Sequence, residues 1–175
     1  ISSGLVGSEM CIRDSIMAPM VNTYEEALKI VQSSKYPPKG VRGAGFGFAH
    51  DNYKNEGPLN YIEKANNNLI NIIQIETKVG LENVEKIAAI EGVDCLWVGH
   101  FDLTNFLGIP GQFSSEIYLN AINRVVAAAK LNKKSLGIMV NNHDELKMYS
   151  NIGFNMIAVG TEMSILSRSI SQILQ

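Results

Sequence analysis

Five short apolar segments, each followed by a longer amphipathic one, constrain the fold of this chain more than any other feature of its sequence. The apolar segments are rich in β-branched residues and are apolar at successive positions, which is typical of parallel strands buried on both faces. They cover residues 16–20, 68–76, 94–100, 135–140 and 155–160. Strands that alternate with helices in this way predict parallel βαβ units.

The segments between these runs carry the signals of amphipathic helices. Thr23 followed by Glu26 has the spacing of a capping box, which predicts a helix that begins just after Thr23. Gly153 is expected to end the helix that begins near His143, because glycine readily takes the left-handed conformation found at many helix ends. The other predicted helices cover residues 80–90, 115–134 and 161–174.

A glycine-rich segment, residues 35–53, interrupts this alternation after the first predicted helix. Its four glycines predict a long loop rather than a strand, because glycine has no side chain to pack on a pleated sheet. A short helical turn is expected near residues 60–66. Long loops in compact domains are usually functional or disordered, and His50 in this loop is expected to be solvated or to gate the substrate.

Five strand–helix units can form either an open, doubly wound sheet or part of a closed barrel. A dinucleotide-binding sheet needs a glycine-rich turn after its first strand, whereas residues 21–26 (VNTYEE) contain no glycine. A barrel needs eight units and roughly 250 residues, so this interpretation expects about three further units upstream. We therefore predict an α/β fold that is the C-terminal part, about five of eight units, of a (β/α)8 TIM barrel.

The first fifteen residues do not fit this pattern. They show neither helical nor strand periodicity, and they lack the basic start and apolar stretch of a signal peptide. We expect residues 1–15 to be a non-native segment that looks like a translated sequencing adapter, and residues 16–175 to form the partial barrel domain.

Composition narrows the classes of function. The chain is 46% hydrophobic and 18% charged with a formal net charge of −2, which gives no sign of a nucleic-acid partner. No stretch approaches the ~18 uninterrupted apolar residues of a membrane span. Cys11 and Cys95 lie in no disulfide or metal-binding spacing, so we expect a reducing compartment, the cytoplasm.

Two acidic residues follow neighbouring predicted strands. Glu76 ends the second apolar run, and Asp102 follows the third. Parallel strands end at the same edge of a sheet, so the two carboxylates should share a small volume and repel each other unless a cation lies between them. Such oxygen ligands suit Mg2+ or Mn2+, and Gln74 adds a polar group on the strand face of Glu76. In the alternative interpretation, each acid caps a nearby helix or turn.

A resemblance to a known family arises at these residues. The segments that carry it are PMVNTYEEA, YPPKGVRG, QIETKVGLENVEKIAAIEGVD, WVGHFDL, GIM and NMIAVGTE, and they resemble the HpcH/HpaI family of 2-oxo-acid aldolases. That family includes 4-hydroxy-2-oxoheptanedioate and 2-dehydro-3-deoxyglucarate aldolases. The resemblance spans residues 16–175 and implies a (β/α)8 barrel, a divalent metal (Mg2+ or Mn2+, with Co2+ also possible), pyruvate enolate chemistry and a homo-oligomer, either a trimer or a hexamer.

The same resemblance implies a role for each candidate site residue. Glu76 and Asp102 would bind the metal, and Gln74 would line the site. The backbone amides of Phe101 and Asp102 would hold the carboxylate of pyruvate, while Met139 would either form an apolar wall against the substrate or belong to the core. The family's catalytic histidine and its enolate-stabilising arginine are expected on upstream strands, outside this chain.

The chain also departs from the family pattern. Many members have proline and then alanine or serine where this chain has His100 and Phe101, so the bulk of Phe101 puts the identity of the substrate in question. His100 either touches the substrate or wedges into the barrel rim. Trp97 is expected to pack between the barrel and its helices, and Cys95 to be an inert buried thiol.

The predicted function is that of a metal-dependent class II aldolase, a carbon–carbon lyase that cleaves 4-hydroxy-2-oxo acids to pyruvate and an aldehyde. One alternative is a citrate-lyase or malyl-CoA type of lyase on a related barrel, although no cluster of basic residues suits a CoA phosphate. Another is a barrel homologue without catalytic activity. The chain by itself is expected to be inactive, because the upstream units would be missing.

Overall fold

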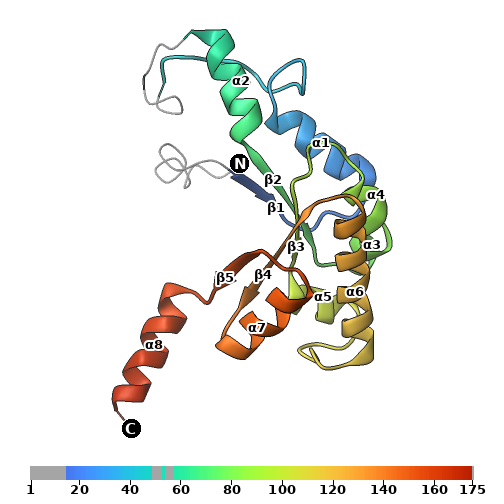
Figure 1. Ribbon diagram of the computed structural model, residues 1–175, viewed down its shortest axis with the longest axis vertical. Coiled ribbons are helices and arrows are strands. Elements are labelled where there is room, and N and C mark those ends of the chain that lie inside the picture. Colours follow the sequence, from blue (N-terminus) through green and yellow to red (C-terminus); the bar gives the residue numbers. More distant parts are fainter. Residues whose placement is uncertain (1–14, 49–52, 54–56, 175) are drawn as a thin grey trace.

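The computed structural model describes residues 15–48, 53 and 57–174, and at its centre is a sheet of five parallel strands (Figure 1). The strands are β1 (Ser15–Ala18), β2 (Ile70–Ile75), β3 (Cys95–Val98), β4 (Ser135–Val140) and β5 (Met156–Val159). They lie in sequence order, each paired in parallel with the next. A doubly wound sheet reverses its strand order at a switch point, whereas a barrel adds strands in sequence, so the predicted partial barrel is confirmed as a half-barrel.

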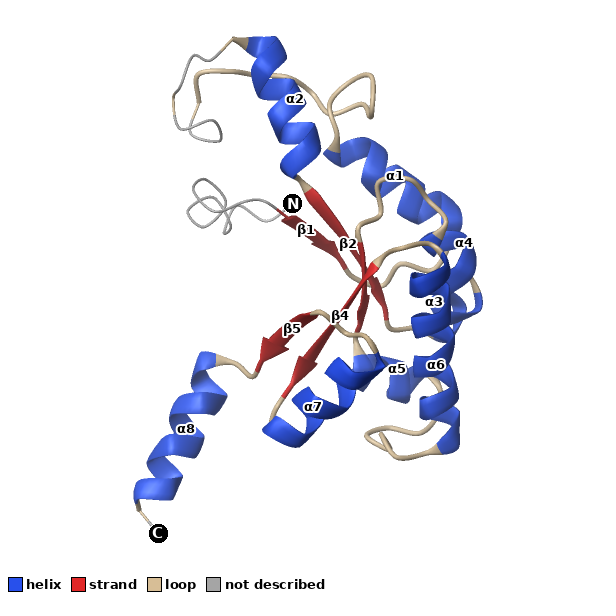
Figure 2. Ribbon diagram, in the orientation of Figure 1, coloured by secondary structure: helices blue, strands red, loops and turns tan. Residues whose placement is uncertain are grey.

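Helices follow the strands, and most of them cover one side of the sheet. They are α1 (Tyr24–Ser34), α2 (Pro58–Asn68), α3 (Lys78–Glu82), α4 (Val84–Ala88), α5 (His100–Phe106), α6 (Glu116–Leu131), α7 (His143–Ile152) and α8 (Glu162–Ile173). Figure 2 shows α1, α3, α4 and α6 grouped on one side of the strands, while α8 extends away beyond β5 and buries none of its residues. No helix in the described part of the chain is both long and apolar enough to cross a membrane.

Local sequence signals explain where several helices begin and end. The Thr23 side chain accepts the N–H of Glu26, and the Glu26 carboxylate accepts the N–H of Thr23, so the predicted capping box is confirmed. Asn142 caps α7 through the N–H of Glu145, which makes His143 the first residue of that helix. Gly153 ends α7 with a φ of 118°, as expected.

Two predicted helices have the wrong extent. The helix expected over residues 80–90 is divided into α3 and α4, which meet at Asn83 with φ −104° and ψ 6°. Asn83 turns its side-chain amide to the carbonyl of Asn22, so a tertiary contact accompanies the break. The turn expected near residues 60–66 is an eleven-residue helix, α2, which begins at Pro58, where proline's missing N–H costs nothing.

The face of the sheet that meets the helices forms the hydrophobic core. Strand side chains on this face alternate with those on the other, and Ile73, Ile75, Leu96, Val98 and Ile138 are fully buried against the helices. Burying each such side chain contributes roughly 1.5–3 kcal/mol to stability. The opposite, inner face is therefore the one where functional side chains can lie.

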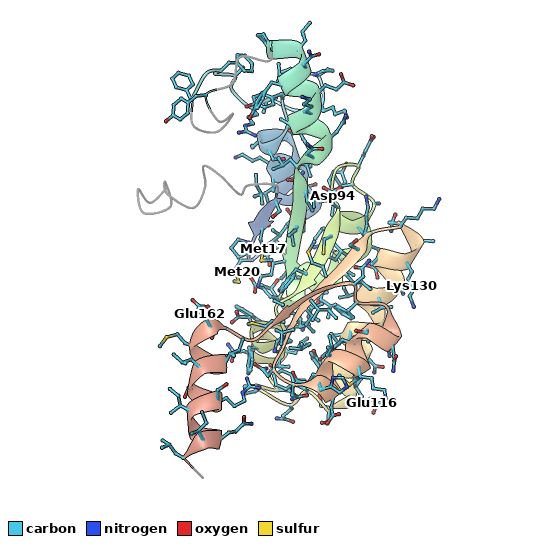
Figure 3. All side chains as sticks on the ribbon, turned by 60° about the vertical axis from the view of Figure 1, so that its left-hand side comes forward. Met17, Met20, Asp94, Glu116, Lys130 and Glu162 are labelled. Carbon is cyan, nitrogen blue, oxygen red and sulfur yellow. The ribbon has the colours of Figure 1, made fainter. Side chains whose placement is uncertain are left out.

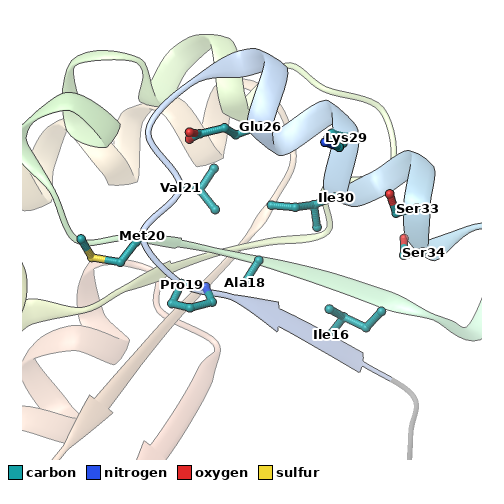
Figure 4. Close-up of a pocket in the computed structure, with 10 residues that line it drawn as sticks. All are labelled: Ile16, Ala18, Pro19, Met20, Val21, Glu26, Lys29, Ile30, Ser33 and Ser34. Atoms are coloured by element: carbon teal, nitrogen blue, oxygen red, sulfur yellow. The ribbon is translucent and has the colours of Figure 1, made fainter. Parts of the chain in front are cut away.

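A groove of about 580 Å3 lies between β1 and α1 (Figure 4). Ile16, Ala18 and Ile30 give it a mainly apolar lining. Ala18 pairs with Ile73 and so faces the helical side of the sheet, which places the groove on the outer side at the edge of β1. In a closed barrel the helix of a preceding unit packs at this position, so we interpret the groove as a packing surface rather than a substrate site.

Some sequence predictions concern residues beyond this description. Residues 1–14 of the predicted non-native segment, including Cys11, lie outside the described residues, and so does His50. Ser15, which that prediction placed in the same segment, is the first residue of β1 and pairs with Ile70.

Candidate active site at the carboxyl ends of β2 and β3

The carboxyl ends of β2 and β3 bring the predicted site residues together. The register pairs Gln74 with Trp97, so both side chains project from the inner face of the sheet. Glu76 lies on the same face, two residues after Gln74. Gly99 lies beside them on the next strand. A Cβ atom at position 99 would collide with Glu76 Oε2 and would lie 3.0 Å from Gln74 Nε2, so only glycine lets these two side chains pack against the end of β3.

Glu76 is buried and firmly held. Its side chain is 3% exposed, and its Oε1 accepts a hydrogen bond of 2.7 Å from the backbone N–H of Met20 in the turn after β1. Burial raises the pKa of the Glu76 carboxyl above its usual range, the hydrogen bond from Met20 lowers it in part, and the nearby charge of Asp102 raises it further. The charge of Asp102 therefore acts on Glu76, and the shared metal site stays a prediction.

Asp102 is held differently, on the first turn of α5. Its side chain is exposed, and its carboxylate accepts no hydrogen bond from the described residues. The alternative interpretation, in which both acids are caps, is wrong for this structure. Thr77 caps α3 by accepting the N–H of Gly80 at 2.9 Å, and Gly99, with no side chain, precedes α5.

The donor set suits a hard divalent cation bound in part by other ligands. The described residues contain no group of three or more His, Cys, Asp or Glu side chains that could hold a metal ion. Two carboxylates from the adjoining ends of β2 and β3 are the kind of partial oxygen shell that Mg2+ and Mn2+ use when a substrate completes their coordination in the space beyond the strand ends. Glu76 and Asp102 would hold such a cation, and Gln74 lies with Glu76 against Gly99.

His100 and Phe101 enter an aromatic cluster at the start of α5. The His100 ring lies 4.6 Å from Phe101 and 5.2 Å from Phe113, and Phe101 lies 5.1 Å from Phe113 in an edge-to-face contact. His100 is 7% exposed, and burial lowers the pKa of its imidazole, an effect that the charge of Glu145 opposes in part. This packing favours the wedge interpretation of His100. Phe101 remains 58% exposed, with one side supported by the cluster.

The inner face beside the carboxylates is formed by Trp97 and Met139. Trp97 pairs with Gly137 on β4, and a Cβ at position 137 would collide with the indole, so the ring lies across Gly137. Trp97 is thus on the inner face beside Gln74, and the prediction that it packs between the barrel and its helices is wrong. Met139 is half-buried on the same face, two residues further along β4.

The structure agrees with the prediction made for Cys95. Cys95 is fully buried at the start of β3, and burial raises the pKa of its thiol to about 12, which fits the expected inert thiol.

Met20 is a residue of the candidate site that sequence reasoning missed. Its N–H comes from 56 positions away in the chain, and its contribution through the backbone leaves no mark on residue type.

Comparisons with known proteins agree with this architecture. A model of the HpcH/HpaI aldolase/citrate lyase family matches residues 11–169. The hydroxypyruvate/pyruvate aldolase of Delftia acidovorans is 36% identical over 155 residues, which is 89% of this chain and 57% of that protein. The 4-hydroxy-2-oxo-heptane-1,7-dioate aldolase of Shigella flexneri is 32% identical over 89% of this chain and 58% of its own length.

Solved structures give the same result. An HpcH/HpaI aldolase/citrate lyase family protein from Burkholderia cenocepacia superposes with a TM-score of 0.86 at 31% identity, over 93% of this chain and 64% of that one. This chain therefore spans less than two thirds of the length of the relatives named here. The family match covers most of the 175 residues and includes both strand ends of the site, so the chain belongs to the HpcH/HpaI aldolase/citrate lyase family.

Proposed function

We propose that this chain is the C-terminal part of a metal-dependent aldolase that cleaves 4-hydroxy-2-oxo acids to pyruvate and an aldehyde. The observation that carries the proposal is the arrangement of Glu76 and Asp102. They come from neighbouring strand ends, the charge of Asp102 contributes to the raised pKa of Glu76, and Glu76 and Gln74 both lie against Gly99 at the end of β3. Two carboxylates at the carboxyl edge of a parallel barrel are well suited to hold a divalent cation.

Each residue of the site has a distinct task in this proposal. Glu76 is held on Oε1 by Met20, and its Oε2, which lies against Gly99, would be the oxygen that binds the cation. Asp102 supplies the second carboxylate. The chemistry that a bound cation supplies is Lewis-acid stabilisation of the negative charge that develops on the 2-oxo oxygen as the carbon–carbon bond breaks.

The remaining groups would bind and orient the substrate. Backbone N–H groups in the first turn of a helix lack partners within the helix, so the amides of Phe101 and Asp102 are suited to donate hydrogen bonds to the substrate carboxylate. Gln74 can donate a hydrogen bond from Nε2, which also lies against Gly99. Met139 and Trp97 close the inner face around these polar groups and limit the access of water.

Both the catalytic base and the enolate-stabilising arginine are part of the proposal and are expected from upstream βα units. The term "completed barrel" is used below for this chain together with the upstream units that close the barrel. It is expected to act on a small-molecule 2-oxo acid in the cytoplasm as a homo-oligomer. The 175-residue chain alone is expected to give no turnover, because an open sheet with two free edges cannot enclose a substrate.

The decisive experiment compares the Glu76→Gln and Asp102→Asn variants of the completed barrel with the unsubstituted parent. Both substitutions keep the side-chain shape and remove the charge, so we expect Mn2+ binding and pyruvate release from a 4-hydroxy-2-oxo acid to be lost together, as they should be in the parent treated with EDTA. Glu116→Gln is the matched control, because Glu116 begins α6 and lies well away from Met20 in Figure 3. Full turnover in excess EDTA would refute the metal site. Cleavage of a CoA thioester in place of the 2-oxo acid would instead identify a citrate-lyase type of reaction.

A further inference from the structure

The turn that follows β1 has an unusual backbone at the point where it touches the site. Met20 has a φ of 55°, in the left-handed region that residues with a Cβ rarely adopt. In this conformation its N–H points to Oε1 of Glu76, at 2.7 Å. A conformation that is unfavourable for the residue itself must be maintained by its surroundings.

The hydrogen bonds of Asn22 maintain this conformation of Met20. Its Nδ2 donates a hydrogen bond of 2.8 Å to the carbonyl of Met20, and its Oδ1 accepts one of 2.5 Å from the hydroxyl of Thr77. The carbonyl of Asn22 in turn accepts a hydrogen bond of 2.9 Å from the side chain of Asn83, at the break between α3 and α4. One half-buried amide thus joins the turn after β1 to the turn after β2.

Thr77 connects the hydrogen bonds of Asn22 to Glu76. It follows Glu76 in the chain, is buried, and uses its hydroxyl both to cap α3 and to reach Asn22. Glu76 is consequently fixed on both sides. Its backbone continues into Thr77, and its Oε1 is taken by the Met20 amide that Asn22 holds in place.

We infer that Asn22 is a positioning residue for Glu76. By holding the Met20 amide against Oε1, it leaves Oε2, which lies against Gly99 and accepts no hydrogen bond from the described residues, as the single oxygen available to a cation. The inference rests on the proposed function, because the cation that Oε2 would meet belongs to that proposal, and it adds a residue on a different strand end that tunes the affinity of the site.

The test measures Mn2+ dissociation constants of the completed barrel without substrate, by electron paramagnetic resonance of the free ion. Residues that orient metal ligands typically change metal affinity by about 10- to 100-fold, so we expect Asn22→Ala to weaken Mn2+ binding about tenfold. Thr77→Val, which removes the hydroxyl, should weaken binding in the same direction. Thr77→Ser keeps the hydroxyl and should stay within about twofold of the parent.

Asn132→Ala is the matched control for lost stability. Asn132 also donates a 2.9 Å hydrogen bond from Nδ2 to a backbone carbonyl, that of Ala128, but it does so at the far end of α6. It should lower the melting temperature without changing Mn2+ affinity. If Asn22→Ala does not fold, Asn83→Ala removes the outer hydrogen bond to Asn22, together with a longer one to the carbonyl of Val79, and should still weaken Mn2+ binding by more than twofold.

The outcomes separate this inference from the proposed function. No Mn2+ binding by the parent would refute the proposed metal site itself. Binding by the parent that Asn22→Ala leaves within twofold, or that Asn132→Ala weakens equally, would overturn the positioning role alone.

Discussion

The two strand ends of the site hold their carboxylates in opposite ways. At the end of β2, Glu76 is buried, hydrogen-bonded through Oε1, and followed by a residue that caps the next helix. At the end of β3, Asp102 is exposed on the first turn of α5 and accepts no hydrogen bond from the described residues. The comparison indicates that one carboxylate sets the position of the site while the other is free to adjust to what binds there.

The largest expected effect comes from changing the length of each carboxylate. Glu76→Asp withdraws the carboxylate from the Met20 amide and from Gly99, so turnover of the completed barrel should fall on the order of 100-fold, as misplacement by about 1 Å can cause. Asp102→Glu should cost only about tenfold, because an exposed side chain can adjust its rotamer. Steady-state pyruvate release measures both variants. Equal losses would mean that the two ends are equally rigid.

The second prediction concerns pH and the buried member of the pair. The pKa of Glu76 is raised in the folded state, so its contribution to stability is greatest below the usual glutamate pKa and is lost as the pH rises through the folded-state value. In EDTA, the free energy of unfolding of the parent should therefore fall relative to that of Glu76→Gln as the pH rises from 4 to 7. Urea unfolding at several pH values measures this difference. A constant difference across the range would contradict the burial of a charge at this position.

A third, more modest effect is expected at Phe101, beside Asp102. In the proposed site, phenylalanine would fill the space next to the substrate carboxylate and cannot donate a hydrogen bond from its side chain, although its backbone N–H still can. Phe101→Ser and Phe101→Ala should therefore retain pyruvate binding and shift the preference between a polyhydroxylated and an apolar aldehyde by about 1–3 kcal/mol. The ratio of the two kcat/KM values for condensation with pyruvate measures the shift. If this ratio does not move, the ring belongs to the His100–Phe113 cluster alone.

The smallest effect is expected at Cys95, which starts β3 on the strand that leads to Asp102. Burial raises the pKa of this thiol to about 12, so at pH 8 it is almost entirely protonated and shielded from reagents. Iodoacetamide should therefore modify Cys95 in the native completed barrel much more slowly than in urea, with no loss of turnover. Mass spectrometry of the peptide that contains Cys95 follows the reaction. Rapid native modification would show that β3 opens in solution.

Much of the site follows from residue types at short range. The alternation of apolar and amphipathic segments predicted the parallel sheet, because a strand buried on both faces and a helix with one apolar face can be distinguished from the sequence pattern. Glu76 and Asp102 were selected as candidates because acids near the ends of neighbouring parallel strands should lie at the same edge of the sheet. Thr23 and Gly153 were identified as helix ends because capping depends on neighbours within a few positions.

Only the tertiary structure decided which of these residues meet, and how. Trp97 was assigned to the wrong face, because a strand that is apolar at successive positions gives no sign of which face is the inner one. The break at Asn83 and the left-handed turn at Met20 depend on contacts with segments 61 and 56 positions away in the chain. A backbone N–H is carried by every residue except proline, so no residue type marks the amide that holds Glu76. Its role exists only because the folded sheet brings the end of β1 beside the end of β2.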